Sequence, residues 1–241
     1  MPIAAKGILE MKIVVLISAD AEWRSVKPLF PTSEVHTSPF GEWFDAKPVS
    51  RHSSLVTFFR GGWGKISAAA TAQYVIDRFQ PDLLVNLGTC GGFEGRIEAG
   101  TILLVEKTIV YDIIEQMGDA DEAIDHYSTN IDLSWLDSRN LLPVFRGLLV
   151  SADRDIVVGD IPMLIEKYGA VAADWESGPI AWVANKNRVR CLILRGVSDL
   201  VGGNGGEVYG KLELFQQRTA EIMQRLVGQL DHWIQAAGGV V

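Results

Sequence analysis

The chain has 241 residues, of which 48% are apolar, and its 22 Lys and Arg against 30 Asp and Glu give a formal net charge of −8. This length and apolar content suffice for one large core, and the negative charge disfavours electrostatic binding to nucleic acid or to an anionic membrane. The apolar runs are strand-sized and interrupted by charge, so we expect no membrane-spanning segment.

The two cysteines, Cys90 and Cys191, lie inside apolar segments that are expected to be buried. This usage predicts free thiols in a reducing cytoplasm rather than a disulfide framework. The start of the chain carries no charged segment followed by an apolar run, which agrees with a cytoplasmic protein.

Residues 1–10 precede the first apolar run and are expected to be an extension. Residues 11–241 are expected to form a single domain, because no low-complexity or Pro/Ser-rich linker divides them. Runs rich in Val, Ile and Leu predict buried strands, which suit a sheet covered on both faces. The predicted strands are residues 11–17, 55–60, 83–88, 101–110, 144–152, 170–174 and 191–197.

Helices are predicted between these strands. Residues 65–79 are Ala-rich, residues 179–185 start with a proline suited to a first helical turn, and residues 212–234 repeat apolar side chains at helical spacing. The alternation predicts an α/β fold: one domain with three α/β/α layers and a central mixed, largely parallel sheet. Residues 112–140 are polar and irregular and are expected to form a long loop.

Two segments place carboxylates beside predicted strands. Residues 173–178 read ADWESG and contain Glu176, and residues 195–199 read RGVSD and end in Asp199, 199 − 176 = 23 residues later. Carboxylates at strand ends of an α/β fold can bind a sugar and protonate a leaving group. Taken singly, Asp199 is equally suited to cap a turn, and Glu176 to favour the positive end of the next helix.

The two segments resemble the E-M-E-x-x and R-x-x-S-D runs of the nucleoside phosphorylase and nucleosidase superfamily. Residues 86–92 (NLGTCGG) are similar to its N-x-G-[ST]-x-G-G turn, and residues 61–65 (GGWGK) to its S-G-[IV]-G-K segment. Within the superfamily the chain most resembles the 5'-methylthioadenosine/S-adenosylhomocysteine nucleosidases, from Met11 onward. The resemblance implies a nucleoside phosphorylase-like fold and hydrolysis of the N-glycosidic bond of a 5'-modified adenosine.

The resemblance also implies roles for the acidic residues. Asp199 would be the general acid at N7 of the purine, oriented by Ser198, and burial would raise its pKa so that it stays protonated. Glu176 would accept hydrogen bonds from the ribose hydroxyls. Glu22, which follows Met11 by 22 − 11 = 11 residues, would activate the attacking water. Without the resemblance, Glu22 would be expected to be an exposed glutamate in a first helical turn.

Further residues are expected to bind the substrate. Thr89 would hydrogen-bond the ribose or the nucleophile, and Tyr209, ten residues after Asp199, would close the 5' side of the pocket. A Gly-rich turn such as the one around Thr89 is by itself a weak signal. The full expected set is Thr89, Gly91, Trp63, Ile156, Trp175, Glu176, Ser198 and Tyr209.

Three positions depart from the family's pattern. Trp175 replaces a methionine, Trp63 replaces a small aliphatic residue, and Asp155 replaces the aromatic residue that stacks on the purine. Loss of a stacking ring would weaken base binding by about 1–3 kcal/mol. The tryptophans would either replace that ring or block the channel for the thioalkyl group.

The nucleophile is predicted to be water. Phosphorylases of the superfamily bind phosphate with a G-D-P loop and an arginine, where this chain has residues 19–21 (ADA) and Asn86. Glu22 would also repel phosphate, although Arg24 and Arg60 remain available as anion ligands. The alternatives are a futalosine-type substrate, phosphorolysis, and a non-catalytic nucleoside-binding or storage protein; the three carboxylates disfavour the last.

No cluster of His, Cys or Asp has metal-ligand spacing, so no metal and no cofactor are predicted. The expected partners are a small-molecule nucleoside and a second copy of the chain, with no nucleic acid and no membrane. The resemblance implies a homodimer in which residues 112–140, including Trp135, help to build the interface and the edge of the active site.

Overall fold

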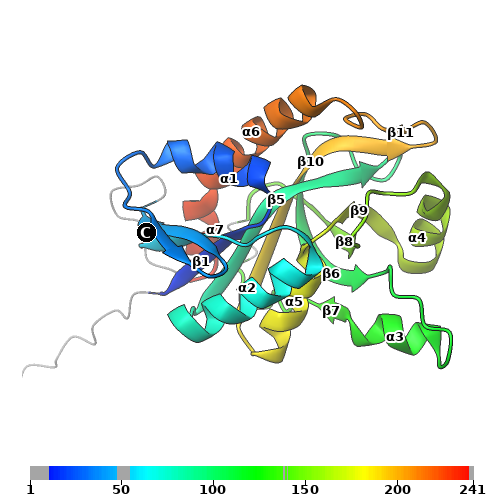
Figure 1. The fold of residues 1–241 in the computed structure, drawn as a ribbon, viewed down its shortest axis with the longest axis horizontal. Helices are drawn as coiled ribbons and strands as arrows, with labels where there is room; N and C mark the ends of the chain where they lie inside the picture. Colours follow the sequence, from blue (N-terminus) through cyan, green and yellow to red (C-terminus); the bar gives the residue numbers. More distant parts are fainter. Residues whose placement is uncertain (1–10, 48–54, 138, 140, 239–241) are drawn as a thin grey trace, which may run out of the picture.

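The computed structural model describes residues 11–47, 55–137, 139 and 141–238, so the predicted extension at 1–10 lies outside the described residues. The described part is an α/β fold (Figure 1). Its strands are β1 (Ile13–Ile17), β2 (His36–Ser38), β3 (Gly41–Ala46), β4 (Val56–Arg60), β5 (Leu83–Phe93), β6 (Ile102–Val110), β7 (Ser128–Asn130), β8 (Phe145–Ser151), β9 (Ala170–Asp174), β10 (Arg190–Gly202) and β11 (Gly205–Gly206). Its helices are α1 (Asp20–Val26), η1 (Lys27–Leu29), α2 (Gly64–Phe79), α3 (Ala120–His126), η3 (Val158–Asp160), α4 (Ile161–Tyr168), α5 (Ser177–Lys186), α6 (Leu212–Gly228) and α7 (Leu230–Ala236).

One mixed sheet organises the molecule. Its strand order is β11-β10-β6-β8-β9-β5-β1-β4-β3-β2, with β7 paired to β6. Strand β10 also pairs with β5, so β10, β6, β8, β9 and β5 close into a ring. The β1–β5, β5–β10 and β6–β8 pairs are parallel, whereas β5–β9 and β6–β10 are antiparallel. The predicted α/β class and mixed sheet are confirmed.

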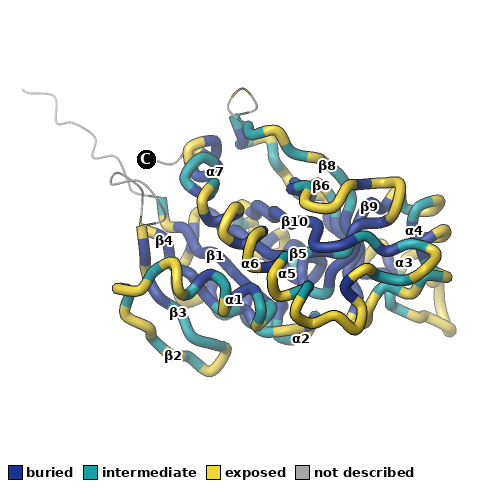
Figure 2. The backbone as a smooth tube through the Cα atoms, turned by 90° about the horizontal axis from the view of Figure 1, so that it is seen from above, coloured by how far each residue is buried: buried dark blue, intermediate teal, exposed yellow. Residues whose placement is uncertain are grey.

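Helices cover both faces of the sheet. Side chains alternate along β1, so Ile13, Val15 and Ile17 pack with α1, α6 and α7, while Val14 and Leu16 pack with α2 and α5. Figure 1 shows these two helical layers, and in Figure 2 the tube is mostly buried along β1, β5 and β10. Because both faces of β1 are apolar, helices pack on each side of the sheet, and this gives the three layers.

Two expected elements were wrong. Residues 212–234 were expected to form one helix, but α6 ends at Gly228 and a separate α7 begins at Leu230, because glycine ends a helix readily. Residues 112–140 were expected to form a loop, but they contain β7 and α3. The N-cap of α3 is Asp119, whose carboxylate accepts hydrogen bonds from the backbone amides of Asp121 and Glu122.

Two strands run further than predicted, and both reach the site described below. The expected turn at residues 86–92 is part of β5, which continues to Phe93. Strand β10 continues to Gly202, so Asp199 lies inside a strand and not at its end. None of the helices in the described ranges is long and apolar enough to cross a membrane.

Candidate active site

Strands β5 and β10 lie side by side and provide the floor of the site. Their parallel register places Gly88 opposite Arg195 and Gly91 opposite Asp199. The register shifts between Val197 and Asp199, so the strand has a β-bulge at the position of Ser198. Bulges re-aim side chains, and this one accounts for two adjacent polar residues in a buried strand.

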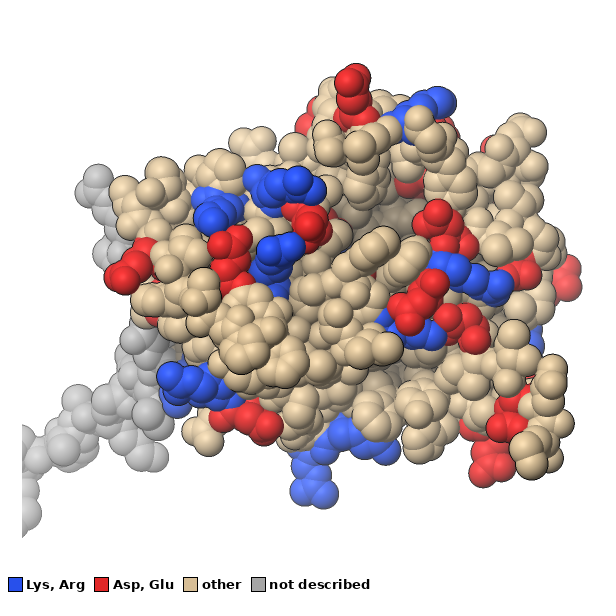
Figure 3. Space-filling model, in the orientation of Figure 1, with Lys and Arg blue, Asp and Glu red and all other residues tan. Residues whose placement is uncertain are grey.

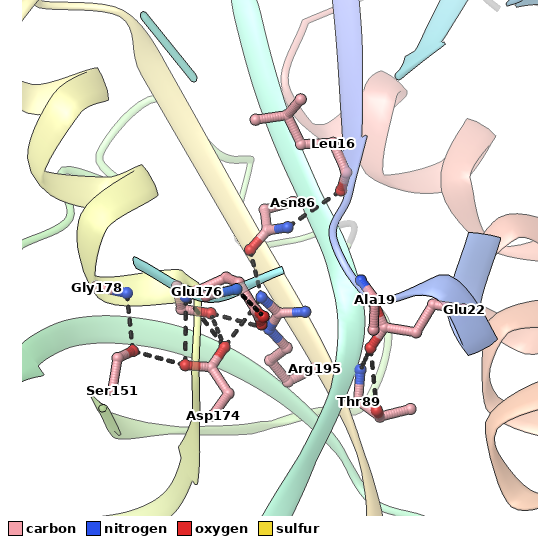
Figure 4. Close-up of polar contacts among 12 residues, drawn as sticks. Leu16, Ala19, Glu22, Asn86, Thr89, Ser151, Asp174, Glu176, Gly178 and Arg195 are labelled. Carbon is pink, nitrogen blue, oxygen red and sulfur yellow. Dashed lines mark hydrogen bonds and ion pairs between the residues drawn. The ribbon is translucent and has the colours of Figure 1, made fainter. Parts of the chain in front are cut away.

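Glu22 lies in the first turn of α1, directly after β1. Its carboxylate accepts hydrogen bonds from the backbone amides of Ala19 (3.1 Å) and Thr89 (2.6 Å) and from the Thr89 hydroxyl (3.0 Å; Figure 4). Glu22 is only 3% exposed, so it is not a solvated helix residue. Burial raises the pKa of Glu22, although the Arg195 charge and the hydrogen bonds oppose the shift.

Arg195 joins the strands that form the site, a role that the sequence did not suggest. Its guanidinium donates to the Asn86 side-chain oxygen (2.6 Å) and the Ser177 hydroxyl (2.9 Å), and it lies 2.9 Å from the Asp174 carboxylate. A Cβ atom on Gly88 would lie 1.7 Å from Arg195 Nη1 and 2.7 Å from Glu22 Oε1. The guanidinium and the Glu22 carboxylate therefore meet over a position that only glycine can occupy.

Asp174 and Glu176 lie where β9 passes into α5. The Asp174 carboxylate accepts hydrogen bonds from the Ser151 hydroxyl (2.6 Å) and the Ser177 hydroxyl (2.5 Å). The Glu176 carboxylate accepts one from the backbone amide of Gly64 (3.1 Å). Burial, with the Asp174 charge, raises the pKa of Glu176 to about 8, and the Arg195 charge opposes the shift. Glu176 is therefore a buried carboxyl group with hydrogen-bonding capacity to spare.

Asp199 is also buried. The Ser198 hydroxyl donates to Asp199 Oδ1 (2.8 Å), while Asp199 Oδ2 has no hydrogen-bond partner among the described residues. Burial raises the pKa of Asp199, and the hydrogen bond from Ser198 opposes the shift. A buried carboxyl oxygen without a partner is suited to a ligand that completes its hydrogen bonds.

Tyr209 and Ile156 lie on the Asp199 side of the site. The Tyr209 hydroxyl accepts a hydrogen bond from the backbone amide of Ile156 (3.0 Å). The Ile156 side chain lies against Gly91, where a Cβ atom would come within 2.7 Å of its Cδ1. Burial, with the charges of Asp155 and Asp199, raises the pKa of Tyr209 to about 12. The structure thus brings these expected residues together.

Trp63 and Trp175 lie beside Glu176. Their rings stack with centroids 5.0 Å apart and planes 20° apart, and Trp63 is 67% exposed. Trp63 is the N-cap residue of α2, whose Gly64 amide binds Glu176. The two tryptophans therefore form one aromatic wall next to the carboxylate expected to bind the ribose.

The candidate anion ligands are engaged elsewhere. Arg60 pairs with Asp20 (2.5 Å), and the Arg24 side chain donates to the Asp20 carbonyl. Asn86 is buried, donates to the Leu16 carbonyl and accepts from Arg195. On the face drawn in Figure 3, basic side chains lie beside acidic ones. In the part of the chain that the structure describes, no three His, Cys, Asp or Glu side chains form a group that could hold a metal ion.

Comparison with known proteins gives consistent matches. The sequence profile of a family described as the Phosphorylase superfamily matches residues 49–230. The 5'-methylthioadenosine/S-adenosylhomocysteine nucleosidase of Thermotoga maritima is 27% identical over 164 residues, which cover 68% of this chain and 73% of that protein. The nucleosidase of the same name from Buchnera aphidicola (strain Tuc7) is 26% identical over 160 residues, covering 62% and 69%.

Solved structures show the same fold. The 5'-methylthioadenosine/S-adenosylhomocysteine nucleosidase of Campylobacter jejuni superposes with a TM-score of 0.73 at 20% identity, covering 91% of this chain and 98% of that chain. The Helicobacter pylori enzyme with butyl-thio-DADMe-Immucillin-A superposes with a TM-score of 0.74 at 17% identity, covering 92% and 99%. The shared fold extends over nearly the whole chain.

Proposed function

Because the chain belongs to the phosphorylase superfamily, we propose that it hydrolyses the N-glycosidic bond of a purine nucleoside, in particular a 5'-modified adenosine such as 5'-methylthioadenosine or S-adenosylhomocysteine. The observation that carries the proposal is a set of three buried carboxyl groups: Glu22 and Glu176, on which the Arg195 charge acts, and Asp199 on the neighbouring part of β10. Three such groups match the three needs of the reaction: a proton for the base, stabilisation of a cationic sugar and activation of water.

Asp199 is the proposed acid. Its unpartnered oxygen would carry the proton to N7 of the purine while the bond between the sugar and the base breaks and its electron pair leaves with the base. The raised pKa keeps the carboxyl group protonated closer to neutral pH than an exposed aspartate. Ser198 would fix its orientation through the hydrogen bond to Oδ1.

Glu176 and Glu22 are the proposed sugar and water ligands. Glu176 would accept hydrogen bonds from the ribose hydroxyls and face the positive charge that develops on the ring. Glu22 would take a proton from the water that attacks the sugar, and its raised pKa makes it a stronger base than an exposed glutamate. Thr89, which donates two hydrogen bonds to Glu22, would hold that carboxylate in place.

Water is the proposed nucleophile because the site lacks the features that would bind phosphate. Asn86 stands at the position of the phosphorylase arginine, and both ends of its amide are bonded inside the protein. Glu22 beside it would repel a phosphate dianion. A futalosine-type nucleoside is the alternative substrate. Its hydrolysis would use the same chemistry and would differ only in the part of the pocket that binds the substituents of the nucleoside.

We propose further that the protein is a cytoplasmic homodimer. Trp63, Ile66, Ile114 and Met117 are exposed, and Ile66 and Met117 are 85% and 100% exposed. The ion pair of Lys65 with Asp112 joins the two segments that carry them. Exposed apolar groups of this kind commonly contact a partner. The free, buried Cys90 and Cys191 agree with a reducing compartment.

The test is purine release from a panel of nucleosides, with and without phosphate. We expect release of adenine from 5'-methylthioadenosine or S-adenosylhomocysteine, with a free sugar as the second product even in excess phosphate. Glu22→Gln should slow release at least about a hundredfold, since the base is lost, whereas the exposed Glu166→Gln should not. A sugar 1-phosphate as main product would show a phosphorylase, and no release from any nucleoside would contradict an enzyme of this class.

A further inference from the structure

The segment after Asp199 carries one side chain back across the site. It comprises the end of β10, the short strand β11 and a turn, and Val201 pairs with Gly206 in this hairpin. Tyr209 follows; the residue is 42% exposed, and its hydroxyl is bonded to Ile156 of the facing loop. The hydroxyl accepts from the Ile156 amide (3.0 Å) and donates to the Ile156 carbonyl (3.4 Å). One tyrosine thus bonds the backbone amide and the backbone carbonyl of one residue.

The Ile156 contact lies on the side of the site where the leaving base is proposed to bind. Ile156 packs on Gly91, and Gly91 lies opposite Asp199 in the sheet. The Asp199 oxygen without a partner is on the same side. A hydroxyl that donates and accepts is chemically equivalent to the edge of a heterocycle that presents a donor beside an acceptor. A purine base has such edges.

We propose that Tyr209 is a latch: its hydroxyl occupies the backbone amide and carbonyl of Ile156 in the ligand-free protein and is displaced by the base of a bound purine. The inference rests on the proposed function for the nature of the ligand. The contact is exposed to solvent, so in the ligand-free protein the Tyr209 hydroxyl takes the place of water on both Ile156 groups until the base arrives. A ligand that displaces Tyr209 must then replace both hydrogen bonds to Ile156. Competition from Tyr209 lowers the affinity of any base that cannot form both of them.

The surroundings of the ring allow it to leave. The ring lies flat on Gly206, where a Cβ atom would come within 2.6 Å of its Cδ1 and Cε1 atoms. The hairpin is held independently by Glu207, which pairs with Arg218 (2.8 Å) and accepts from the Leu200 amide. Release of the hydroxyl therefore needs a rotation of the Tyr209 side chain and leaves the backbone in place.

The test compares Tyr209→Phe with the wild type, using adenine as the probe because it is not consumed. The variant keeps the ring and loses only the hydroxyl. We expect adenine to bind roughly three- to tenfold more tightly by calorimetry, since it no longer competes with the two hydrogen bonds. Tyr74→Phe is the matched control: Tyr74 lies in the middle of α2, packs on Phe40 and Phe59 and should leave the affinity unchanged.

A second measurement needs no ligand. In the free protein, the Ile156 amide should exchange with solvent deuterium faster in Tyr209→Phe than in the wild type, because its acceptor is gone. Gly206→Ala, which removes the seat of the ring but keeps the hydroxyl, should change the affinity in the same direction as Tyr209→Phe.

Each outcome decides between the latch and the proposed function. Unchanged exchange of the Ile156 amide would overturn the latch whatever the protein binds. Faster exchange with equal or weaker adenine binding would show that the hydroxyl does not compete with the base, and would also overturn it. If no purine or purine nucleoside binds to either protein, the proposed function fails, and with it the claim that a base displaces Tyr209.

Discussion

A single buried arginine stands among several carboxyl groups in this site. Arg195 pairs with Asp174, and its charge also acts on Glu22 and Glu176. One positive charge cannot compensate three negative charges away from water, so the pKa values of Glu22 and Glu176 are raised. This charge balance connects the acid–base chemistry of the site with the pH dependence of its stability.

Asp199→Asn tests the proposed acid. The amide keeps the shape and can still hydrogen-bond the base, but it has no proton to deliver. We expect a folded protein that binds nucleoside within about tenfold of the wild type and retains less than about a hundredth of its turnover. Wild-type activity should fall as the pH rises through the raised pKa of Asp199, because the acid form is consumed. Turnover of the variant near the wild-type rate would assign the acid to another group.

Glu176→Gln tests the charge balance through stability. The pKa of Glu176 is raised to about 8 in the folded protein, so the folded state binds a proton that the unfolded state has lost above its ordinary pKa. The contribution is therefore present at low pH and is lost as the pH rises from about 5 to about 8. Gln does not titrate, so between pH 5 and 9 the variant should gain at least about 1.4 kcal/mol relative to the wild type, the equivalent of one pKa unit.

Urea unfolding at both pH values gives the free energies of unfolding for this comparison. The contributions of groups that titrate in both proteins cancel when the free energy of unfolding of the wild type is subtracted from that of the variant. A constant difference between variant and wild type across this range would mean that Glu176 keeps an ordinary pKa.

At the scale of helices and strands, the sequence predicts those elements whose position depends on a local pattern of apolar residues. The strand at 170–174 was predicted with its observed bounds, and those at 55–60 and 101–110 within one residue at each end, because each is rich in apolar residues and is bounded by glycine on at least one side. The extensions of β5 and β10 beyond their apolar cores were missed. Glycine and polar residues there resemble a turn, and pairing with each other and with β9 and β11 keeps them extended.

The candidate site was predicted from local segments in the same way. Glu22, Glu176 and Asp199 were proposed because their short segments resemble those of the family, and their roles remain predictions. The role of Arg195 was missed because its partners Asn86 and Asp174 lie far away in the sequence and meet it only through the closed sheet. Likewise, no local pattern predicts the stack of Trp63 on Trp175 or the bond of Tyr209 to Ile156.

Gly88→Ala tests the close approach of the β5 backbone to the Arg195 guanidinium. The added methyl group would overlap Arg195 Nη1 and crowd the Glu22 carboxylate, so the buried ion pair must shift. We expect the free energy of unfolding to fall by at least about 2 kcal/mol and turnover to fall at least tenfold. Gly159→Ala is the control, because its Cβ atom would meet no atom within 4 Å. Equal stabilities of the two variants would contradict the close approach.

At the scale of the whole molecule, the exposed apolar residues predict how the chain assembles. A two-fold dimer is expected to bury more than about 1,000 Å² in total, with part of residues 112–140 near the partner's pocket. Ile66→Glu and Met117→Glu should convert the dimer into a monomer at micromolar concentration, because charge would be buried in an apolar contact. Light scattering measures the mass.

The control for assembly is Leu29→Glu. Leu29 is also exposed, but it follows α1, which packs on the face of the sheet opposite to α2. This variant should remain a dimer. A wild-type chain that scatters as a fully active monomer would contradict the proposed assembly.

The closed ring of strands also determines when the chain can finish folding on the ribosome. Strand β10 inserts between β5 and β6, although its first residue is made 190 − 83 = 107 positions after its partner in β5. Until β10 leaves the exit tunnel, the edges of β5 and β6 remain open, and Asp174 has no arginine beside it. A nascent chain therefore carries unpaired strand edges, the templates for aggregation, while the 107 positions that separate these two partners are made. Contacts between residues so far apart in the sequence form slowly. The ring that assembles the site therefore leaves the edges of β5 and β6 open to aggregation until β10 has been made and has paired with them.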